Sequence, residues 1–216
     1  MKDYRALRFY NGVDARSYEE RRFARVRGRI VDHLEWGLLA RGLRMLMSQT
    51  GRLATVGDIP IGTGRMGVRL RMTGLHVVGV DASSDMLSVA RAKNAANEYV
   101  LGRVEQLSSA VAPVDCIVSL RLFGHLPGDV QAVALREIRE VANYGCVVCY
   151  AADTRWLRIR RWLQGLSGRT LSGWTALADA DARRMAESAG FDVLGILRLL
   201  GPISETHAMV LRCSGG

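Results

Sequence analysis

A glycine-rich stretch is the part of this sequence whose residue types and spacing are best suited to chemistry. Residues 56–67 read VGDIPIGTGRMG, and Gly62, Gly64 and Gly67 fit the spacing G-x-G-x-x-G. Glycine allows positive φ angles and close approach of the backbone, and a helix N-terminus behind it presents free N–H groups. The stretch therefore predicts a cradle for an anion or a nucleotide, and its spacing alone does not say which.

Two aspartates narrow the choice of ligand. Asp81 ends the apolar run LHVVGVD, where an acid can accept hydrogen bonds from both hydroxyls of a ribose; the alternative is that it only caps the following helix. Asp58 directly precedes the glycines, and a carboxylate placed there would repel a pyrophosphate but not a ligand that carries an ammonium and a sulfonium. The pair favours S-adenosylmethionine over NAD or FAD, unless Asp58 points away from the ligand.

Alternating strands and helices are expected to position these residues. From residue 52 onward, apolar runs predict strands and three-to-four spacing predicts helices, which indicates an α/β, doubly wound, seven-stranded and mostly parallel sheet. The final two strands, FDVLGILRLL and THAMVLRC, are joined by only a short link. A parallel crossover needs a dozen or more residues, so the last strand should be antiparallel.

An N-terminal helical cap is expected to cover this core. Residues 17–48 have apolar residues at helical spacing, and interior glycines can divide the segment into two helices. We therefore expect residues 1–50 to form a cap or lid and residues 51–216 to form the core. Within the core, residues 152–176 are expected to form a lid insertion.

The composition is that of a globular, strongly basic protein. Of the 216 residues 49% are hydrophobic, the formal net charge is +9, and all but two of the 30 basic residues are arginines. Such a surface attracts anions, although charge alone does not favour nucleic acid. No apolar run reaches the roughly 18 residues that span a bilayer, and the N-terminal stretch lacks the apolar core of a secretion signal. We therefore expect a cytoplasmic protein.

The four cysteines are then expected to be reduced. Cys146 and Cys149 form a C-x-x-C pattern within the β-prone run GCVVCYAA. Residues three apart on a strand point to opposite faces, so these two thiols cannot share a metal ion. We expect no metal site.

Taken together, the motifs resemble those of the class I (Rossmann-like) S-adenosylmethionine-dependent methyltransferases. DIPIGTGR (58–65) resembles the first motif of that family, VVGVDASSDML (77–87) its second-strand motif, and VDCIVSLRLFGHLP (114–127) its fourth strand and the loop after it. The resemblance extends over roughly residues 50–213. It implies a methyltransferase that uses S-adenosyl-L-methionine.

The resemblance also implies which residues would bind the cofactor: Asp58, Gly62, Gly64, Asp81, Ala82, Met86, Val104 and Ser119. Asp58 would set the loop and place the amino-acid end of the cofactor, and the two glycines would let the backbone approach it. Asp81 would hold the ribose, while Ala82 and Met86 would line the adenine. Val104 would meet the adenine edge through its backbone, and Ser119 would lie beside the methionine portion.

Two residues depart from the pattern of the family. Pro60 stands where a glycine is common, which removes a backbone donor but keeps a turn. Arg103 stands where an acid often contacts the adenine amino group, and a guanidinium cannot accept a hydrogen bond. Glu105, two residues on, can take that place. A non-catalytic homologue that keeps the cofactor fold and an NAD-dependent oxidoreductase therefore remain alternatives.

Two residues are candidates for the chemical step. Methyl transfer is an in-line displacement in which alignment supplies much of the rate, so no metal is required. His125, after the fourth strand, is a candidate base for a hydroxyl or a protonated amine, or else a loop histidine that bonds to backbone. Tyr18 resembles the aromatic residue that family members often lay near the methyl group, or else packs the N-terminal helix on the core.

The acceptor is expected to be a small molecule, in specialised metabolism for example. The chain has no Asn/Asp-Pro-Pro-Tyr/Phe motif after the fourth strand, no Pro-Cys nucleophile and no acid-acid-Asn set. These absences argue against nucleic-acid and metal-dependent catechol methylation. Arginines in the N-terminal segment and in residues 155–166 would suit an acidic or phosphorylated acceptor. The alternative is a lipid or quinone at a membrane, contacted peripherally through 155–166, or RNA.

Overall fold

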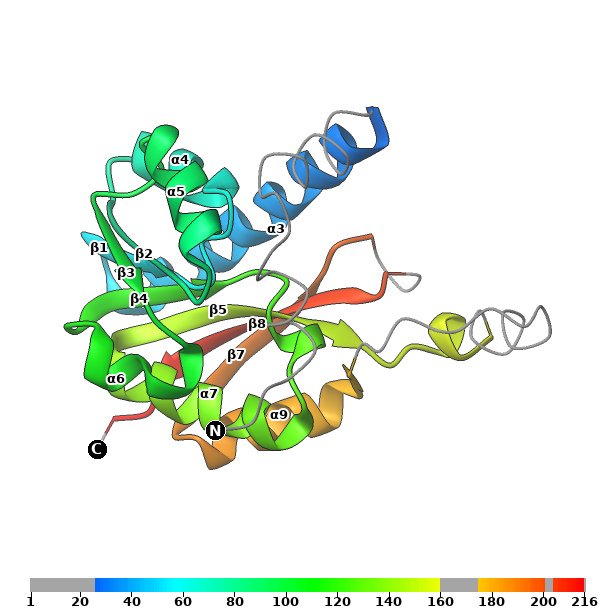
Figure 1. Cartoon of the computed structure of the whole chain (residues 1–216). Helices are drawn as coiled ribbons and strands as arrows, with labels where there is room; N and C mark the ends of the chain where they lie inside the picture. The colour runs from blue at the N-terminus through cyan, green and yellow to red at the C-terminus, as the bar shows by residue number, and fades with distance from the viewer. Residues whose placement is uncertain (1–25, 160–174, 201–203, 216) are drawn as a thin grey trace.

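A twisted sheet runs through the molecule and carries helices on both faces (Figure 1). The computed structural model describes residues 26–159, 175–200 and 204–215 of the chain. Within these ranges the sheet has eight strands, in the order β3-β2-β1-β4-β5-β8-β7 with β6 paired to β5. The strands are β1 Thr55–Asp58, β2 His76–Asp81, β3 Glu98–Leu101, β4 Val114–Ser119, β5 Ala142–Ala152, β6 Ala176–Leu177, β7 Phe191–Arg198 and β8 Thr206–Cys213.

The strand directions confirm the predicted doubly wound fold. The five strands from β3 to β5 pair in parallel, and β8 pairs antiparallel with both β5 and β7. The two-residue strand β6 is the one addition to the seven predicted strands. The chain moves outward from β1 to β3 and then returns to β4, so the strand order reverses between β1 and β4. Ligands of such sheets bind in the crevice outside the carboxyl ends of the strands at this reversal.

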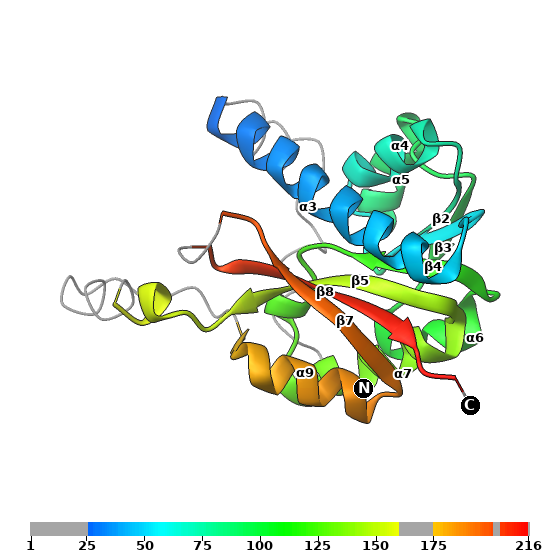
Figure 2. The ribbon, with the colours of Figure 1, turned by 180° about the vertical axis from the view of Figure 1, so that it is seen from behind.

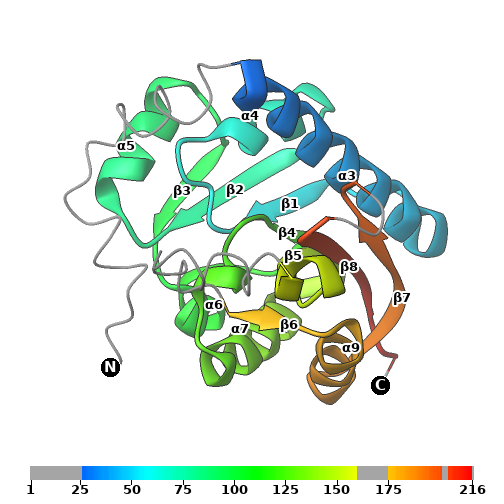
Figure 3. The ribbon, with the colours of Figure 1, turned by 90° about the vertical axis from the view of Figure 1, so that its right-hand side faces the viewer.

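The helices form two layers, one on each face of the sheet (Figure 3). The helices α3, α4 and α5 cover one face, and α6, α7 and α9 cover the other. Short 3-10 helices cover 104–106 and 123–125, and residues 155–159 are helical. The α-helix bounds are α3 Val26–Thr50, α4 Arg65–Met72, α5 Ser84–Ala92, α6 Leu107–Ala110, α7 Gly128–Val141 and α9 Asp179–Ser188.

Each layer encloses its own apolar core. Leu39 and Leu46 of α3 are fully buried in one core, and Leu135 and Ile138 of α7 in the other. Burying one such side chain stabilises the fold by about 1.5–3 kcal/mol. The two cysteines of the C-x-x-C pattern are divided between the cores, as predicted, and both are free thiols.

The helix α3 is continuous and is not divided by its glycines. It runs unbroken from Val26 to Thr50 and packs across β5, β8 and β7 (Figure 2). A Cβ atom at Gly42 would lie 2.8 Å from Cγ1 of Val147, so the missing side chain lets the helix approach β5 closely. The expected division of this segment into two helices was wrong. Gly42 allows close packing against the sheet and does not break the helix. The expected helix start at residue 17 lies outside the described residues.

Two further expectations fall largely outside the described part of the chain. Of the predicted cap, residues 1–25 are not described, and of the predicted lid insertion, residues 160–174 are not. The boundaries of these two segments therefore stay predictions. In the described ranges, none of the helices combines the length and the apolar character that crossing a membrane requires.

Candidate functional site

The glycine loop lies at the carboxyl edge of the sheet, between β1 and α4. Gly62 and Gly64 have φ angles of 56° and 82°, in the left-handed region that side chains disfavour. A Cβ atom at Gly64 would also lie 2.3 Å from that of Ala95, so conformation and packing both require glycine there. Gly67 lies within α4, and its Cβ would come within 2.5 Å of the Ala95 carbonyl oxygen. The third glycine of the motif therefore serves helix packing.

Asp81, at the end of β2, holds the glycine loop in place. Its Oδ2 accepts a hydrogen bond from the N–H of Gly62 at 2.8 Å, and its Oδ1 accepts one from the N–H of Ser83 at 2.9 Å. The cap of α5 is instead Ser83, whose hydroxyl accepts from the N–H of Met86. Burial raises the pKa of Asp81 above its ordinary value, against the effect of its backbone hydrogen bonds. Asp81 is therefore not the cap of α5; it joins β2 to the glycine loop.

Two buried oxygen atoms at the ends of β1 and β4 have no hydrogen-bond partner among the described residues. They are Oδ2 of Asp58 and Oγ of Ser119, in residues that are 2% and 1% exposed. Burial raises the pKa of Asp58 to about 7; the charge of Arg65 opposes this rise, and the nearby Asp81 adds to it. Buried polar groups are nearly always hydrogen-bonded, so these two oxygens mark a place for a ligand that brings donors.

The predicted adenine contacts lie in the segments that follow β2 and β3: Met86 is in α5, and Val104 begins the 3-10 helix 104–106. Met86 and Val104 are buried, at 3% and 5% exposure, and Ala82 is partly exposed. The two residues that depart from the pattern lie together here, since Nη2 of Arg103 donates to Oε1 of Glu105 at 2.7 Å. Glu105 could replace the acid that is missing near the adenine. Its carboxylate is paired with Arg103, the residue that stands where that acid is common.

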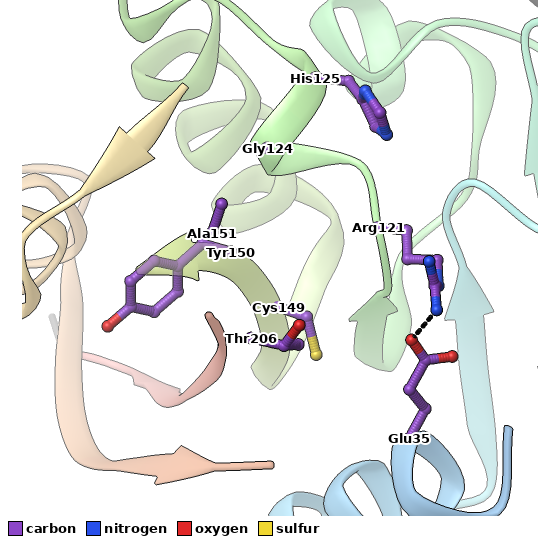
Figure 4. Close-up of a pocket in the computed structure, with 8 residues that line it drawn as sticks. All are labelled: Glu35, Arg121, Gly124, His125, Cys149, Tyr150, Ala151 and Thr206. Carbon is purple, nitrogen blue, oxygen red and sulfur yellow. Dashed lines mark ion pairs between the residues drawn. The ribbon is translucent and has the colours of Figure 1, made fainter. Parts of the chain in front are cut away.

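A pocket opens at the carboxyl ends of β4 and β5 (Figure 4). It is lined by Glu35, Arg121, Gly124, His125, Cys149, Tyr150, Ala151 and Thr206. The side chains of Arg121 and His125 both come from the segment after β4, while the ring of Tyr150 points away from Cys149 and Thr206. Burial raises the pKa of Cys149 to about 12, so this thiol stays protonated at neutral pH.

His125 is the one predicted candidate for the chemical step that the structure describes. It ends the short helix 123–125, is partly exposed and lines the pocket, while Tyr18 lies outside the described residues. In the described ranges, no set of three or more His, Cys, Asp or Glu side chains is arranged to hold a metal ion.

A partly buried ion-pair cluster joins α3 to α4 and to the segment after β4, and sequence reasoning missed it. Glu35 is 2% exposed and accepts from Nη2 of Arg65 at 2.7 Å, while its other oxygen pairs with Arg121. One turn earlier on α3, Asp32 pairs with Arg65 and Arg69. The acids stand three residues apart and the arginines of α4 stand four apart, which places each pair on one helix face. This spacing of acids and arginines was the signal in the sequence that could have indicated the pairing of α3 with α4. Nothing in the sequence indicated that Arg121 joins them.

The comparisons with known proteins agree with this geometry. Residues 56–145 match a family model described as a methyltransferase domain. Two curated relatives, uncharacterised methyltransferases of Bacillus mycoides and Bacillus cereus, are each 30% identical over 95 residues. That match covers 44% of this chain and 44% of each relative, so the chain spans less than half the length of the curated relatives it matches.

Solved structures resemble the chain over nearly its whole length. The magnesium protoporphyrin IX methyltransferase of Synechocystis with bound S-adenosylhomocysteine has a TM-score of 0.78 at 16% identity, covering 97% of this chain and 98% of that one. A TehB-like S-adenosylmethionine-dependent methyltransferase of Corynebacterium glutamicum has a TM-score of 0.63 at 20% identity, covering 95% and 100%. The 1,6-didemethyltoxoflavin-N1-methyltransferase of Burkholderia thailandensis has a TM-score of 0.63 at 16% identity. The match covers 100% of this chain and 93% of that one. At these identities the likeness shows the fold.

Proposed function

We propose that this chain, which has the fold of the class I S-adenosylmethionine-dependent methyltransferases, transfers a methyl group from S-adenosyl-L-methionine to a small molecule. The observation that carries the proposal is the buried carboxylate of Asp58: one of its oxygens has no partner in the described part of the chain, and it lies beside a glycine loop tethered by Asp81. A cationic, ribose-bearing ligand matches both acids, whereas the pyrophosphate of a dinucleotide would meet a carboxylate at the loop.

The residues at the carboxyl edge of the sheet fit this cofactor. Its ammonium group would donate to the unpartnered oxygens of Asp58 and Ser119, which accounts for two buried acceptors that otherwise cost free energy. A carboxylate has about four acceptor positions, so Asp81 can hold the loop and still accept from ribose hydroxyls. Met86 and Val104 offer buried apolar surface for the adenine.

The pocket beside the loop is where the acceptor would be aligned. When bound, the cofactor supplies a methyl group already activated by its sulfonium. The protein then needs to hold the acceptor in line with the methyl group and to keep water out. Cys149 and Ala151 of β5 are buried, uncharged residues that line the pocket and help to exclude water. His125 lines the same pocket and would accept a proton from a hydroxyl or ammonium acceptor. This reaction needs no metal ion.

A small-molecule acceptor has support from two of the structural neighbours. By their names, the Synechocystis and Burkholderia thailandensis enzymes methylate magnesium protoporphyrin IX and 1,6-didemethyltoxoflavin. Peripheral membrane contact through residues 155–166 stays a prediction, because 160–166 lie outside the described residues.

Titration calorimetry with S-adenosylmethionine, S-adenosylhomocysteine and NAD tests the proposal. We expect the first two to bind and NAD not to bind, and binding of NAD alone would overturn the proposal. Labelled methyl transfer into small-molecule extract, RNA or lipid vesicles would then identify the class of acceptor. Cofactor binding without transfer to any of the three would indicate a non-catalytic homologue.

The affinity for S-adenosylhomocysteine is expected to rise with pH up to about pH 7. Burial raises the pKa of Asp58 to about 7, and a bound ammonium pairs only with its ionised form. Below pH 7 binding must therefore release a proton, so the affinity should fall about tenfold for each pH unit. Calorimetry at pH 6 in two buffers of different ionisation enthalpy measures that proton. Asp58→Asn should remove the dependence, and an equal wild-type affinity from pH 5.5 to 8 would contradict it.

Ionisation of the Asp58 carboxyl group, which favours cofactor binding, destabilises the ligand-free protein. Its pKa is raised in the folded state, so its contribution to stability is fully present below the ordinary value of 3.8 and is lost as pH rises through about 7. Asp58→Asn should therefore unfold with a higher free energy than wild type at pH 8, by on the order of 1 kcal/mol. A substitution that stabilises the protein while weakening cofactor binding is what a functional carboxylate predicts.

A further inference from the structure

We infer that Arg65 is a positioning residue of the cofactor site, because its buried positive charge favours the ionised form of Asp58 that the ammonium of the cofactor needs. Asp32 and Glu35 of α3 hold Arg65 in place for this role. The inference rests on the proposed function, because it concerns the same cofactor. It gives the ion pairs between α3 and α4 a task in cofactor binding that neither the family match nor the structural neighbours assign.

Arg65 lies between the glycine loop and α3. It is the first residue of α4 and directly follows Gly64, whose left-handed backbone precedes the helix. Nη2 of Arg65 donates to Oε2 of Glu35 at 2.7 Å, and Nη1 pairs with Oδ1 of Asp32. The side chain of Arg65 is only 15% exposed, so solvent screens its charge weakly. The guanidinium is therefore fixed at the N-terminal end of α4.

Asp58 lies against the same turn of α4. Its carboxyl group accepts a hydrogen bond from the backbone N–H of Gly67, two residues after Arg65. Its Oδ2 has no hydrogen-bond partner among the described residues. The first turn of α4 therefore provides Asp58 with both a backbone donor and a nearby positive charge, and each of these favours the charged form of a carboxyl group.

The charged groups around Asp58 oppose one another. Burial raises the pKa of Asp58 to about 7, the charge of Arg65 acts to lower it, and Asp81 of β2 acts to raise it. Two buried carboxyl groups disfavour each other's ionisation, so Arg65 is the cation that brings the ionised form of Asp58 within reach of neutral pH. The charged side chains that α3, α4 and the segment after β4 bring to Arg65 belong to the ion-pair cluster: Asp32, Glu35, Arg69 and Arg121.

The amino-acid end of the cofactor carries a carboxylate as well as an ammonium, so it brings no net charge to the site. Its carboxylate stays ionised between pH 6 and pH 8.5. Any attraction between Arg65 and that carboxylate would therefore act equally over this range. An effect of Arg65 through Asp58 changes with pH, because it acts on a titrating group. The pH dependence of binding thus distinguishes the two effects of one positive charge.

The affinity for S-adenosylhomocysteine at two pH values tests the inference. Titration calorimetry at pH 8.5 and pH 6 gives a ratio of affinities that is insensitive to any loss common to both. With a pKa of about 7 for Asp58, the wild-type ratio should be about 10. Arg65→Gln and Arg65→Met both remove the charge, and the ratio should rise to about 80 if the midpoint moves up by about one pH unit. Titration of the ligand's own groups is common to all the proteins and cancels in the comparison.

Further variants separate charge from packing. The two neutral variants differ in polarity but should give the same ratio, and in both of them Asp32 keeps Arg69 and Glu35 keeps Arg121, so the fold should be retained. Arg65→Lys retains a positive charge and should stay near the wild-type ratio. The matched control is Arg69→Gln, which removes the next arginine on the same face of α4 and should leave the ratio at about 10.

A double variant links the effect to Asp58. In the Asp58→Asn background, Arg65→Gln should leave the ratio unchanged, and a change there would assign the effect to another group. Neutral variants with the wild-type ratio would overturn the inference, even if they bound more weakly at both pH values, and so would an equal rise in Arg69→Gln. Failure of the wild type to bind S-adenosylhomocysteine would overturn the proposed function first, whereas binding with one ratio for the wild type and both neutral variants would overturn this inference alone.

Discussion

Replacing Asp81 with alanine is expected to weaken the binding of S-adenosylhomocysteine by about 100-fold or more. The substitution removes the proposed ribose acceptor and also the carboxylate that holds the N–H of Gly62 at 2.8 Å. Hydrogen bonds to a charged group contribute about 1.5–3 kcal/mol each, so the loss of two corresponds to at least about two orders of magnitude in affinity. Titration calorimetry at pH 8, above the pKa of about 7 of Asp58, measures the change.

Two further variants make this result specific. Asp81→Asn keeps the shape and one acceptor oxygen, so its affinity should lie between those of the wild type and the alanine variant. Asp85→Ala removes an exposed acid from the first turn of α5, four residues away, and should leave the affinity nearly unchanged. Equal affinities of Asp81→Ala and wild type would rule out the ribose assignment.

Replacing Glu35 with alanine is expected to lower the free energy of unfolding by about 3 kcal/mol or more. Glu35 is 2% exposed between two guanidinium groups, and its removal leaves buried positive charge with less compensation. Breaking a buried pair by removing one partner typically costs 3–5 kcal/mol, and Arg65 retains Asp32, which favours the lower end of that range. Urea denaturation measures the change in free energy, and the midpoint temperature of thermal unfolding should fall by roughly 6–12 °C.

An exposed ion pair provides the control for Glu35. Asp181 pairs with Arg184 on α9, and both side chains are at least half exposed. Asp181→Ala should therefore change the free energy of unfolding by less than about 1 kcal/mol. If the two alanine variants were destabilised equally, the buried cluster would contribute no more than a surface pair.

The fold was predictable because its signals are local. Each parallel strand is an apolar run that ends at a turn, and each of the longer helices shows its own periodicity, so their order followed from short windows. The four-residue helix α6 was not predicted. The strand β6 escaped prediction because two residues carry no periodicity. The glycines of α3 were misinterpreted because local propensity disfavours glycine in a helix, whereas the contact of Gly42 with Val147 is formed only by the tertiary fold.

The cofactor side of the site was predictable for the same reason, and the acceptor side was not. Asp58 and Asp81 end apolar strands, so their positions at the sheet edge could be inferred from the sequence. The pairing of Glu35 with Arg121 joins segments that are far apart in the chain. In a sequence with 30 basic residues, charge alone could not single out one arginine. Its exposure relative to its partner became visible only in three dimensions.

The unbroken helix α3 connects the sheet rigidly to the pocket. Glu35 and Gly42 stand two turns apart on the same face, roughly 10 Å along the axis. With no hinge between them, a displacement at one position reaches the other almost undiminished. Substitutions that alter how closely the helix rests on β5 should therefore shift the guanidinium of Arg121 as well. Variants with altered acceptor choice are expected to map to the buried sheet contacts of this helix as well as to the pocket itself.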